Sequence, residues 1–323
     1  MNPETTLTPK QITTIFKEHG LAELPEITRI TVGFTNEVYQ VDDYILKVCV
    51  KEANEPNFRK EEFLYELLQA TVPVPHIVVA DDSRTLLNKP YMIYRKLPGE
   101  PVATHWHKMT NEQRRALIKT LCMYLKAIDT TPLEQYNEQL HVDPHFSWQE
   151  HVCSRIDEKL IVLAKQKLLP DATIAQIKAF IEENKHVLRE QPLGLTFWDV
   201  HFDNILVNDN YQLSGLIDFE SIDVYPIDYR LMTVDIMQRY PQLYLSEEVE
   251  PFAKKEDYEH IMDWYEEFYP ELFAFPDIEK RIDFYDLLDI VSKLPEWPTA
   301  RNLWERLTVI LDSKCYVRRK YGR

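Results

Sequence analysis

The sequence contains few cysteines, few glycines and no long apolar run. Its four cysteines lie far apart and form no CxxC pair, which argues against a zinc knuckle and against a disulfide framework. No uninterrupted apolar stretch reaches the roughly 18 residues of a membrane span, and the first residues lack the basic start and apolar core of a signal peptide. These absences predict a cytoplasmic protein with reduced thiols and without a membrane partner.

Positive charge is also scarce. The chain has 37 Lys and Arg against 53 Asp and Glu, and its formal net charge of −16 argues against nucleic acid as a partner, because a phosphate backbone is bound by clustered basic residues. Between residues 241 and 290 there are 15 Asp or Glu and only 4 Lys or Arg, interleaved with Trp264, Tyr265, Phe268 and Tyr269. This segment is either a solvated helical face, which is the commoner case, or a surface that attracts a cationic substrate.

The first hundred or so residues carry strand patterns around one main helix. Thr8 followed by Pro9 is typical of a helix start and predicts a short helix to about Gly20. β-Branched and aromatic runs between turn residues predict an antiparallel meander with strands over Ile27–Val32, Glu37–Val41, Tyr44–Val50 and Pro90–Leu97. Apolar residues at helical spacing predict one interrupting helix over Phe58–Ala70.

Beyond Gly99 the pattern changes to long helices. Apolar periodicity predicts helices over Asn111–Ile128, Trp148–Lys165 and Thr173–Arg189, with helical patterns again from Pro226. In the segment 194–220 a loop leads instead into a predicted hairpin of Ile205–Val207 and Tyr211–Phe219. The chain is therefore predicted to be an α+β protein of two lobes, residues 1–97 and residues 98–323, with a cleft suited to a cofactor.

The N-terminal strands and helix carry candidates for contacts with phosphate. Gly33 lies between two predicted strands, where its backbone could approach a phosphate or simply form a hairpin turn. Pleat alternation places Lys47 on an otherwise apolar strand face, so its ammonium group either holds phosphate oxygens or points outward from an edge strand. Glu61 is a better candidate partner for Lys47 than Glu62, because Glu61 shares the apolar stripe of its helix. The alternative, which is common for either residue, is a solvated glutamate on the helix surface.

The segment 194–220, GLTFWDVHFDNILVNDNYQLSGLIDFE, concentrates candidate oxygen ligands. Asn204 begins one strand of the predicted hairpin and Asp218 ends the other, so pairing would bring an amide and a carboxylate oxygen together. Such donors suit Mg²⁺, which keeps other positions for phosphate oxygens and water. Asp199 is then left to accept or orient the proton of a substrate hydroxyl. We expect His201 to support this loop rather than bind a metal, because the histidines at 141, 145 and 151 form no tight ligand motif with it.

The order of these motifs resembles that of the aminoglycoside phosphotransferase and choline kinase superfamily, which has a protein-kinase-like fold. GFTNEVYQV at 33–41 resembles the nucleotide loop of that superfamily, YILKV contains its strand lysine, and YMIYRKLPGEPV at 91–102 resembles its connector and the turn after it. WDVHFDNILV followed by GLIDFE is the strongest match and resembles the catalytic loop and the metal-binding segment. The similarity covers most of the chain.

The resemblance implies a role for each matching residue. ATP would be bound by Gly33, Thr35, Asn36, Lys47 and Glu61, and its adenine by the backbone of Tyr94, Arg95, Lys96 and Leu97. Asp199 would be the catalytic base, Asn204 and Asp218 would be Mg²⁺ ligands, and Asp228 would brace the catalytic loop. The chain departs from the superfamily at Phe197, Trp198 and Tyr225, where the superfamily has a histidine, a small residue and an acidic residue.

The predicted function is ATP- and Mg²⁺-dependent transfer of a γ-phosphoryl group to a hydroxyl of a small molecule. The acidic and aromatic C-terminal region makes aminoglycosides, amino alcohols and choline-like cations the candidate acceptors. One alternative is a nucleotide-binding pseudokinase or regulatory module with little turnover, which the bulky Phe197 and Trp198 would suit. Another is a kinase acting on protein hydroxyls, which is less favoured because no evident activation segment follows Asp218.

Overall fold

The computed structural model of the protein describes residues 6–30, 36–140, 146–189 and 192–312. The chain forms two compact units, each of which combines segments that are far apart in the sequence. The first consists of Met1–Ala127, His201–Ile222 and Tyr244–Phe252, and the second of Ile128–Val200, Asp223–Leu243 and Ala253–Arg323. Across the described ranges, no helix combines the length and the apolar character needed to cross a membrane.

A five-stranded antiparallel sheet forms the centre of the first unit. Its strands are β1 (Ile27–Ile30), β2 (Asn36–Val41), β3 (Tyr44–Cys49), β4 (Ile77–Asp81) and β5 (Tyr91–Arg95). Their order in the sheet is β1-β2-β3-β5-β4. Lys47 of β3 is paired with Val38 of β2 on one side and with Met92 of β5 on the other. The strand that carries Lys47 is therefore the middle strand, which rules out the alternative of a lysine on a sheet edge.

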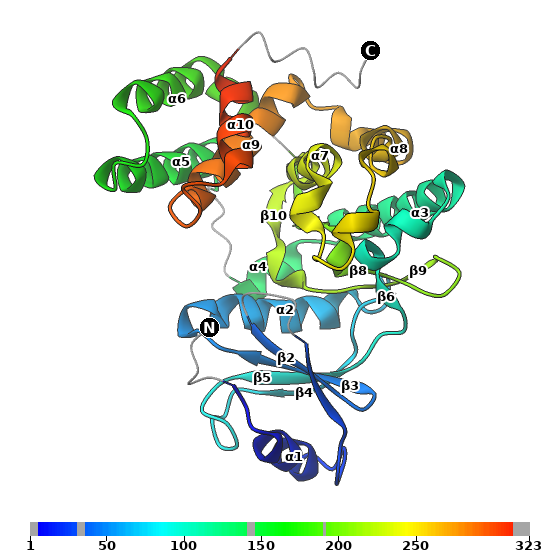
Figure 1. Cartoon of the computed structure of the whole chain (residues 1–323). Coiled ribbons are helices and arrows are strands. Elements are labelled where there is room, and N and C mark those ends of the chain that lie inside the picture. Colours follow the sequence, from blue (N-terminus) through cyan, green and yellow to red (C-terminus); the bar gives the residue numbers. More distant parts are fainter. Residues whose placement is uncertain (1–5, 31–35, 141–145, 190–191, 313–323) are drawn as a thin grey trace. The chain divides into compact units, whose positions relative to one another are not determined.

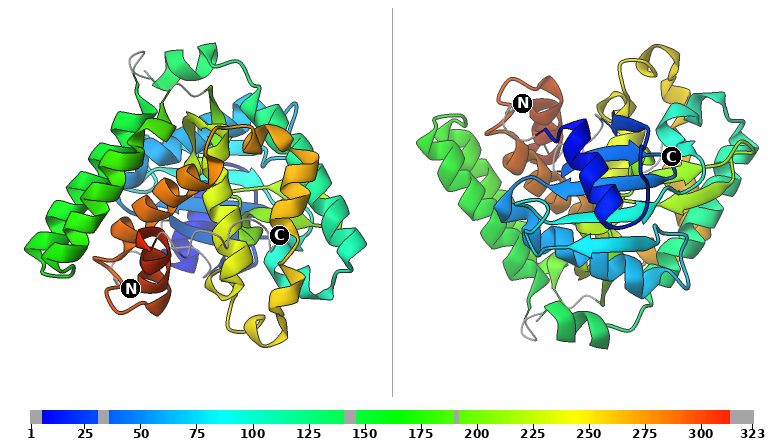
Figure 2. Two further views of the ribbon diagram at one scale, coloured as in Figure 1. Left: turned by 90° about the horizontal axis from the view of Figure 1, so that it is seen from above. Right: turned by 90° about the horizontal axis from the view of Figure 1, so that it is seen from below.

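Helices cover both faces of this sheet (Figure 1). α1 (Pro9–Glu18) buries Ile12 and Phe16 against the face that includes Leu46 and Val48 of β3. Figure 2 shows this helix lying across the strands. α2 (Glu55–Leu68) lies on the opposite face and buries its own apolar stripe there. Each large apolar side chain removed from water in this way contributes about 2 kcal/mol, so burial on both faces fixes the pleat of β3.

The predicted start of the first helix is confirmed in detail. The Thr8 hydroxyl accepts a hydrogen bond from the backbone N–H of Gln11, and the Gln11 side chain accepts one from the N–H of Thr8. This capping box satisfies two of the N–H groups that a helix start leaves without intrahelical partners. The helix ends at Glu18, and Gly20 follows with a φ of 67°.

A second, smaller sheet completes the first unit. It contains β6 (Glu100–Pro101), β8 (Ile205–Val207) and β9 (Leu213–Leu216) in the order β6-β8-β9. The predicted hairpin is thus present as β8 and β9, with Ile205 opposite Leu216. Gly99 leads into β6 with a φ of 103°, and a Cβ atom at this position would lie 2.4 Å from the carbonyl oxygen of Val207. Glycine is therefore the residue that this close approach requires.

The second unit is mainly helical. Its helices are α4 (Glu134–Leu140), α5 (Trp148–Lys165), α6 (Asp171–Asn184), α7 (Leu231–Arg239), α8 (Ile261–Phe268), α9 (Ile278–Lys293) and α10 (Arg301–Leu311). The last two residues of α3 (Asn111–Asp129) also belong to this unit, and the rest of that helix belongs to the first. α5 packs against α6 and α9, and α9 packs against α10, as Figure 1 shows. The long helices predicted from apolar periodicity are therefore present.

Two short strands were not predicted. β7 (Leu193–Phe197) lies where a loop was expected, and it pairs with β10 (Ile222–Pro226), which ends where helix was expected to resume. Each strand has only five residues, and its partner lies more than 20 residues away. A local pattern of apolar residues carries too little information to identify such a pair.

Candidate functional site

Lys47 is the centre of a buried polar cluster in the first unit. Leu46 and Val48, its neighbours in β3, belong to the apolar core under α1, so the pleat turns Lys47 toward the face that α2 covers. The lysine is only 5% exposed. A buried ammonium group is costly unless it is paired, and two carboxylates supply the pairing here.

The two partners of Lys47 come from distant parts of the sequence. The Nζ atom of Lys47 lies 2.6 Å from Oε2 of Glu61 and 2.8 Å from Oδ1 of Asp218. Glu61 is fully buried, whereas the Asp218 side chain is 40% exposed. The structure thus brings together three residues identified in the sequence, and it selects Glu61 over Glu62, which is only partly buried and lies outside this cluster.

This pairing changes the proton affinities of both buried groups. Burial by itself would lower the pKa of Lys47, but the charges of Glu61 and then Asp218 outweigh it and raise the pKa well above its usual value. Lys47 is therefore charged at neutral pH. Burial raises the pKa of Glu61 to about 7, with the charge of Lys47 opposing the shift.

Asp218 has a specific backbone conformation. Its φ of 63° and ψ of 56° lie in the left-handed region, which a non-glycine residue adopts only where its surroundings hold it. Its N–H donates a 2.9 Å hydrogen bond to the hydroxyl of Tyr65 on α2, and that hydroxyl donates a 2.6 Å bond to Oε1 of Glu61. Both oxygens of Glu61 are therefore occupied, one by Lys47 and one by Tyr65.

The hairpin register brings Asn204 to the segment that carries Asp218. Asn204 immediately precedes β8, and its carbonyl oxygen accepts a 3.0 Å hydrogen bond from the N–H of Ile217. The side-chain amide nitrogen of Asn204 lies 3.2 Å from Nε2 of His201. The backbone N–H of Asn204 also donates a hydrogen bond to the carbonyl oxygen of His201. His201 therefore contacts the predicted metal ligand directly, in keeping with a supporting role.

Glu220 adds a carboxylate that the sequence interpretation missed. One oxygen each of Glu61, Asp218 and Glu220 lie within 4.8 Å of one another, a spacing that could hold a metal ion. Oε2 of Glu220 also accepts a 3.2 Å hydrogen bond from the side chain of Asn36, the first residue of β2. Because Glu61 is already used by Lys47 and Tyr65, Asp218 and Glu220 are the better carboxylate donors for a hard cation.

Sequence signals for the two missed residues existed, although they were weak. Tyr65 lies four residues after Glu61, so it shares the same helical face. Glu220 lies two residues after Asp218, in the 3₁₀ turn Phe219–Ser221. Neither spacing distinguishes a functional residue from a solvated one without the fold.

The connector after β5 was predicted to contact adenine through its backbone. Tyr94 is buried in β5, and its ring lies 6.1 Å from that of Tyr65. The N–H groups of Arg95 and Lys96 donate to the carbonyls of His76 and Asp43, at 3.2 Å and 2.9 Å. Those two donors are therefore occupied within the unit.

The remaining predicted residues lie elsewhere. Gly33 and Thr35 are outside the described residues. Asp199 is half-buried in the second unit, two residues after the end of β7. Asp228 is fully buried in the same unit, where both its oxygens accept hydrogen bonds from Arg281, at 2.6 Å and 2.7 Å. This bidentate pair explains why Asp228 can be buried.

The bulky residues that precede Asp199 pack into the second unit. Phe197 ends β7 and is fully buried. The ring centroid of Trp198 lies 5.7 Å from that of Tyr229, which in turn packs against Tyr285 at 4.9 Å. The departures from the superfamily pattern are thus accommodated as aromatic packing.

The acid-rich segment 241–290 is not simply a solvated face. Trp264, Tyr265 and Tyr269 are buried, so these rings belong to the core of the second unit and do not form an exposed aromatic surface. Asp286 is also buried and accepts hydrogen bonds from Arg306 and, at 3.1 Å, from Arg239. Part of the acidity is therefore neutralised inside the protein.

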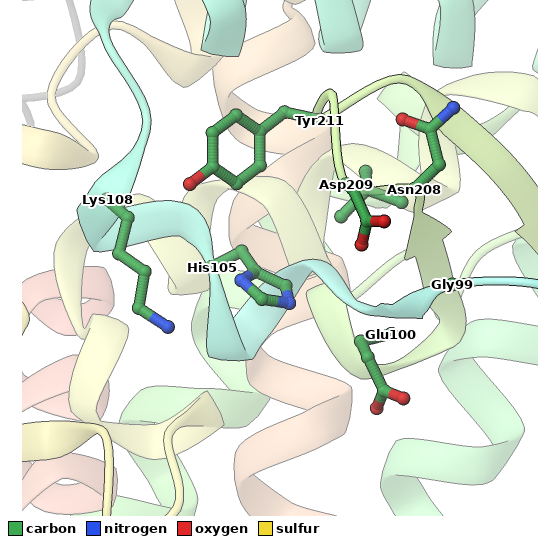
Figure 3. Close-up of a pocket in the computed structure, with 8 residues that line it drawn as sticks. Gly99, Glu100, His105, Lys108, Asn208, Asp209 and Tyr211 are labelled. Atoms are coloured by element: carbon green, nitrogen blue, oxygen red, sulfur yellow. The ribbon is translucent and has the colours of Figure 1, made fainter.

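A pocket of about 220 Å³ lies in another part of the first unit. Its lining comes from the segment after the connector and from the β8–β9 turn, as Figure 3 shows, and includes Glu100, His105, Lys108, Asp209 and Tyr211. None of the predicted site residues lines it. It is a surface depression with charges of both signs and is separate from the Lys47 cluster.

Comparison with known protein families and with curated protein sequences gives a match to a family. The sequence model of the phosphotransferase enzyme family matches residues 26–245. No curated protein sequence matches the chain at a significant level.

Three solved structures illustrate the similarity of fold. APH(2″)-Ib, an aminoglycoside phosphotransferase with ADP bound, is 18% identical, with 95% of this chain and 97% of that one covered and a TM-score of 0.68. The streptomycin–ATP–APH(2″)-IIa ternary complex is 16% identical, with 95% and 96% covered and a TM-score of 0.66. The GDP and kanamycin complex of APH(2″)-IIIa is 17% identical, with 95% and 99% covered and a TM-score of 0.69. The predicted protein-kinase-like α+β fold is thereby confirmed.

Proposed function

Because the chain belongs to the phosphotransferase enzyme family, we propose that it transfers the γ-phosphoryl group of ATP, with Mg²⁺, to a hydroxyl of a small molecule. One observation carries this proposal: Lys47, held between Glu61 and Asp218, is a buried cation on the middle strand of the sheet. Phosphoryl transfer requires fixed positive charge beside the phosphate groups, and Lys47 would supply that charge.

The nucleotide would be bound through the first unit. Lys47 would hold phosphate oxygens, and the N–H of Leu97 would donate to adenine, since those of Arg95 and Lys96 are already used. Gly33, Thr35 and Asn36 would approach the phosphates from the loop before β2. The solved relatives were crystallised with ADP, ATP and GDP, which supports a purine nucleotide as the ligand.

Mg²⁺ suits the donors that the structure brings together. Asn204 and Asp218 would hold it, and Glu220 offers a further carboxylate within reach of the Asp218 oxygens. The set is made of hard oxygen donors, which magnesium prefers over nitrogen or sulfur. When bound, the ion would neutralise charge on the phosphate oxygens.

Asp199 would act on the acceptor. It would take the proton of the attacking hydroxyl as the new O–P bond forms and the bond between the γ-phosphorus and the bridging oxygen of ADP breaks. Asp228 and His201 would support the catalytic segment without touching the reacting atoms. The proposal also retains the division into lobes at residues 1–97 and 98–323, and a cytoplasmic location, which the free thiols of Cys49 and Cys153 support.

The acceptor class that we favour is a small cation, such as an amino sugar, an amino alcohol or a choline-like molecule. The net charge of −16 supports attraction of a cation, and the solved relatives include complexes with streptomycin and kanamycin. Because Trp264, Tyr265 and Tyr269 are buried, a cationic acceptor would be attracted by exposed carboxylates and not by these rings.

A panel of hydroxyl compounds tests the proposal. ADP release would be measured with Mg²⁺ and ATP in the presence of cationic compounds and of neutral sugars of similar size. We expect release to be stimulated by at least one cationic compound. Stimulation by neutral sugars alone would contradict the acceptor class, and nucleotide binding without stimulation by any compound would favour a regulatory module.

A further inference from the structure

Tyr65 connects the two carboxylate residues of the Lys47 cluster. It lies on α2, four residues after Glu61, and is 1% exposed. Its hydroxyl donates to Oε1 of Glu61 at 2.6 Å and accepts from the N–H of Asp218 at 2.9 Å. One buried oxygen atom therefore joins the helix that carries Glu61 to the backbone of the segment that carries Asp218.

The ring of Tyr65 holds the same segment from a second direction. Its centroid lies 5.4 Å from that of Phe219, the residue after Asp218, and 6.1 Å from that of Tyr94. The peptide group before Asp218 is thus fixed by a hydrogen bond, and the side chain after it is fixed by packing. Because Asp218 is in the left-handed region, it needs such constraints to keep a single conformation.

Packing alone does not explain a tyrosine at this position. Phenylalanine would fill the same volume without burying a hydroxyl group, and a buried hydroxyl is unfavourable unless it is bonded. The hydroxyl of Tyr65 has both a donor and an acceptor partner. Its contribution is therefore to orient these two partners relative to each other. Both partners belong to the cluster around Lys47.

We propose that Tyr65 is a positioning residue, whose hydroxyl sets the conformation of Asp218 and thereby the strength with which the protein binds Mg²⁺ beside a nucleotide. The metal part of this inference rests on the function proposed above. The conformational part does not, because it concerns the protein without ligands.

The test compares Tyr65→Phe with Tyr91→Phe. Tyr91, on β5, is a matched control because it is buried to the same extent as Tyr65 and its hydroxyl is also bonded, to Asp81 at 2.7 Å and to His19 at 2.7 Å. Both variants keep the aromatic ring and lose only a hydroxyl. Circular dichroism and thermal melting confirm that each variant is folded.

The first measurement is amide hydrogen exchange in the absence of nucleotide and metal. We expect the Asp218 amide to exchange about tenfold faster in Tyr65→Phe, because it loses its acceptor, and to be unchanged in Tyr91→Phe. In the wild-type protein the Asp218 amide should exchange slowly. If it exchanged as fast as an amide in an exposed loop, the proposal would be contradicted. This wild-type result does not depend on whether Tyr65→Phe folds.

The second measurement is the Mg²⁺ concentration that gives half-maximal binding of a fluorescent ATP analogue. We expect it to rise about tenfold in Tyr65→Phe, while affinity for the analogue in EDTA stays within about twofold. A purely structural loss would change both values or neither. Unchanged exchange and unchanged Mg²⁺ dependence would overturn the proposal. Failure of the wild-type protein to bind the analogue would instead count against the proposed function, and the exchange experiment would still decide the role of Tyr65.

Discussion

The Nζ atom of Lys47 lies 2.6 Å from Oε2 of Glu61, and both side chains are almost completely removed from solvent. A buried ion pair of this kind is no strong source of stability, because each charge has lost its hydration. Its presence on the middle strand of a sheet is better explained by the need for a fixed cation. Asp218, which is more exposed, is the partner that can exchange Lys47 for a ligand.

Removing one member of this pair should destabilise the protein. We expect Lys47→Met to lower the free energy of unfolding by about 3 kcal/mol, because Glu61 is left buried without its counter-ion. Adding Glu61→Gln to Lys47→Met should recover much of this loss. Urea denaturation of the two single variants and the double variant measures the coupling. Lys51→Met, at an exposed position two residues after β3, is the control. A loss of unfolding free energy for Lys47→Met that is no larger than the loss for this control would contradict the prediction.

The sequence predicted this pair because local rules apply to both of its members, although it left an edge lysine and a solvated glutamate open as alternatives. Pleat alternation placed Lys47 on an apolar face, and helical periodicity selected Glu61 over Glu62. Hairpin pairing likewise indicated that Asn204 and Asp218 would approach each other. Each inference needs only the period of one element and the burial cost of one polar group.

Binding of nucleotide should depend on the ionisation of Glu61. Since its pKa is raised to about 7, a fall in pH from about 8 to about 6 protonates the group and removes the charge that holds Lys47. The Mg²⁺-ATP affinity of the wild type should therefore exceed that of Glu61→Gln at pH 8, and the two should converge near pH 6. The titration of ATP itself affects both proteins equally and cancels in the ratio.

The neighbouring glutamate provides the control for this pH dependence. Glu62→Gln removes a carboxylate one residue away that does not contact Lys47, so its affinity ratio to wild type should stay flat with pH. A ratio for Glu61→Gln that is equally flat from pH 6 to pH 8 would show that ionisation of Glu61 does not control binding.

The ion pair between Arg281 and Asp228 should be structural. Arg281 also donates to the carbonyl of Val187 at 2.6 Å and to the hydroxyl of Tyr285 at 2.7 Å, so all its partners lie in the core of the second unit. We expect Arg281→Met to cost about 3 to 5 kcal/mol of unfolding free energy and to change nucleotide affinity less than about threefold. Arg301→Met, which is highly exposed, should cost less than about 0.5 kcal/mol. Loss of nucleotide affinity in Arg281→Met at unchanged stability would contradict a structural role.

The turn after the connector should not tolerate a side chain. In Gly99→Ala the new Cβ would lie 2.4 Å from the carbonyl oxygen of Val207 and 2.5 Å from Oγ of Ser214. We expect a loss of about 2 kcal/mol or more in unfolding free energy. Gly20→Ala also has a positive φ but meets no atom within 4 Å, so it isolates the backbone cost of about 1 kcal/mol. Equal losses in the two variants would show that the close approach at Gly99 is relieved at little cost.

Other parts of the site could not be found from the sequence, for physical reasons. Tyr65 is important here only because its hydroxyl meets the N–H of Asp218, a contact between residues 153 positions apart. Glu220 joins Asn36 across 184 positions. The strands β7 and β10 are too short to show a period, and Trp264 and Tyr265 are buried by packing against other helices. These features depend on tertiary contacts rather than on local pattern.

Phosphoryl transfer by Asp199→Ala, with the best acceptor of the hydroxyl panel, is the most direct test of the proposed reaction. The rate of γ-phosphoryl transfer should fall by roughly 100-fold to 10,000-fold, the range typical of a lost general base, while ATP affinity stays within about threefold. Asp209→Asn, an exposed carboxylate on the β8–β9 turn, is the matched control and should transfer at the wild-type rate. Transfer by Asp199→Ala at the wild-type rate would contradict the assignment of Asp199 as the base.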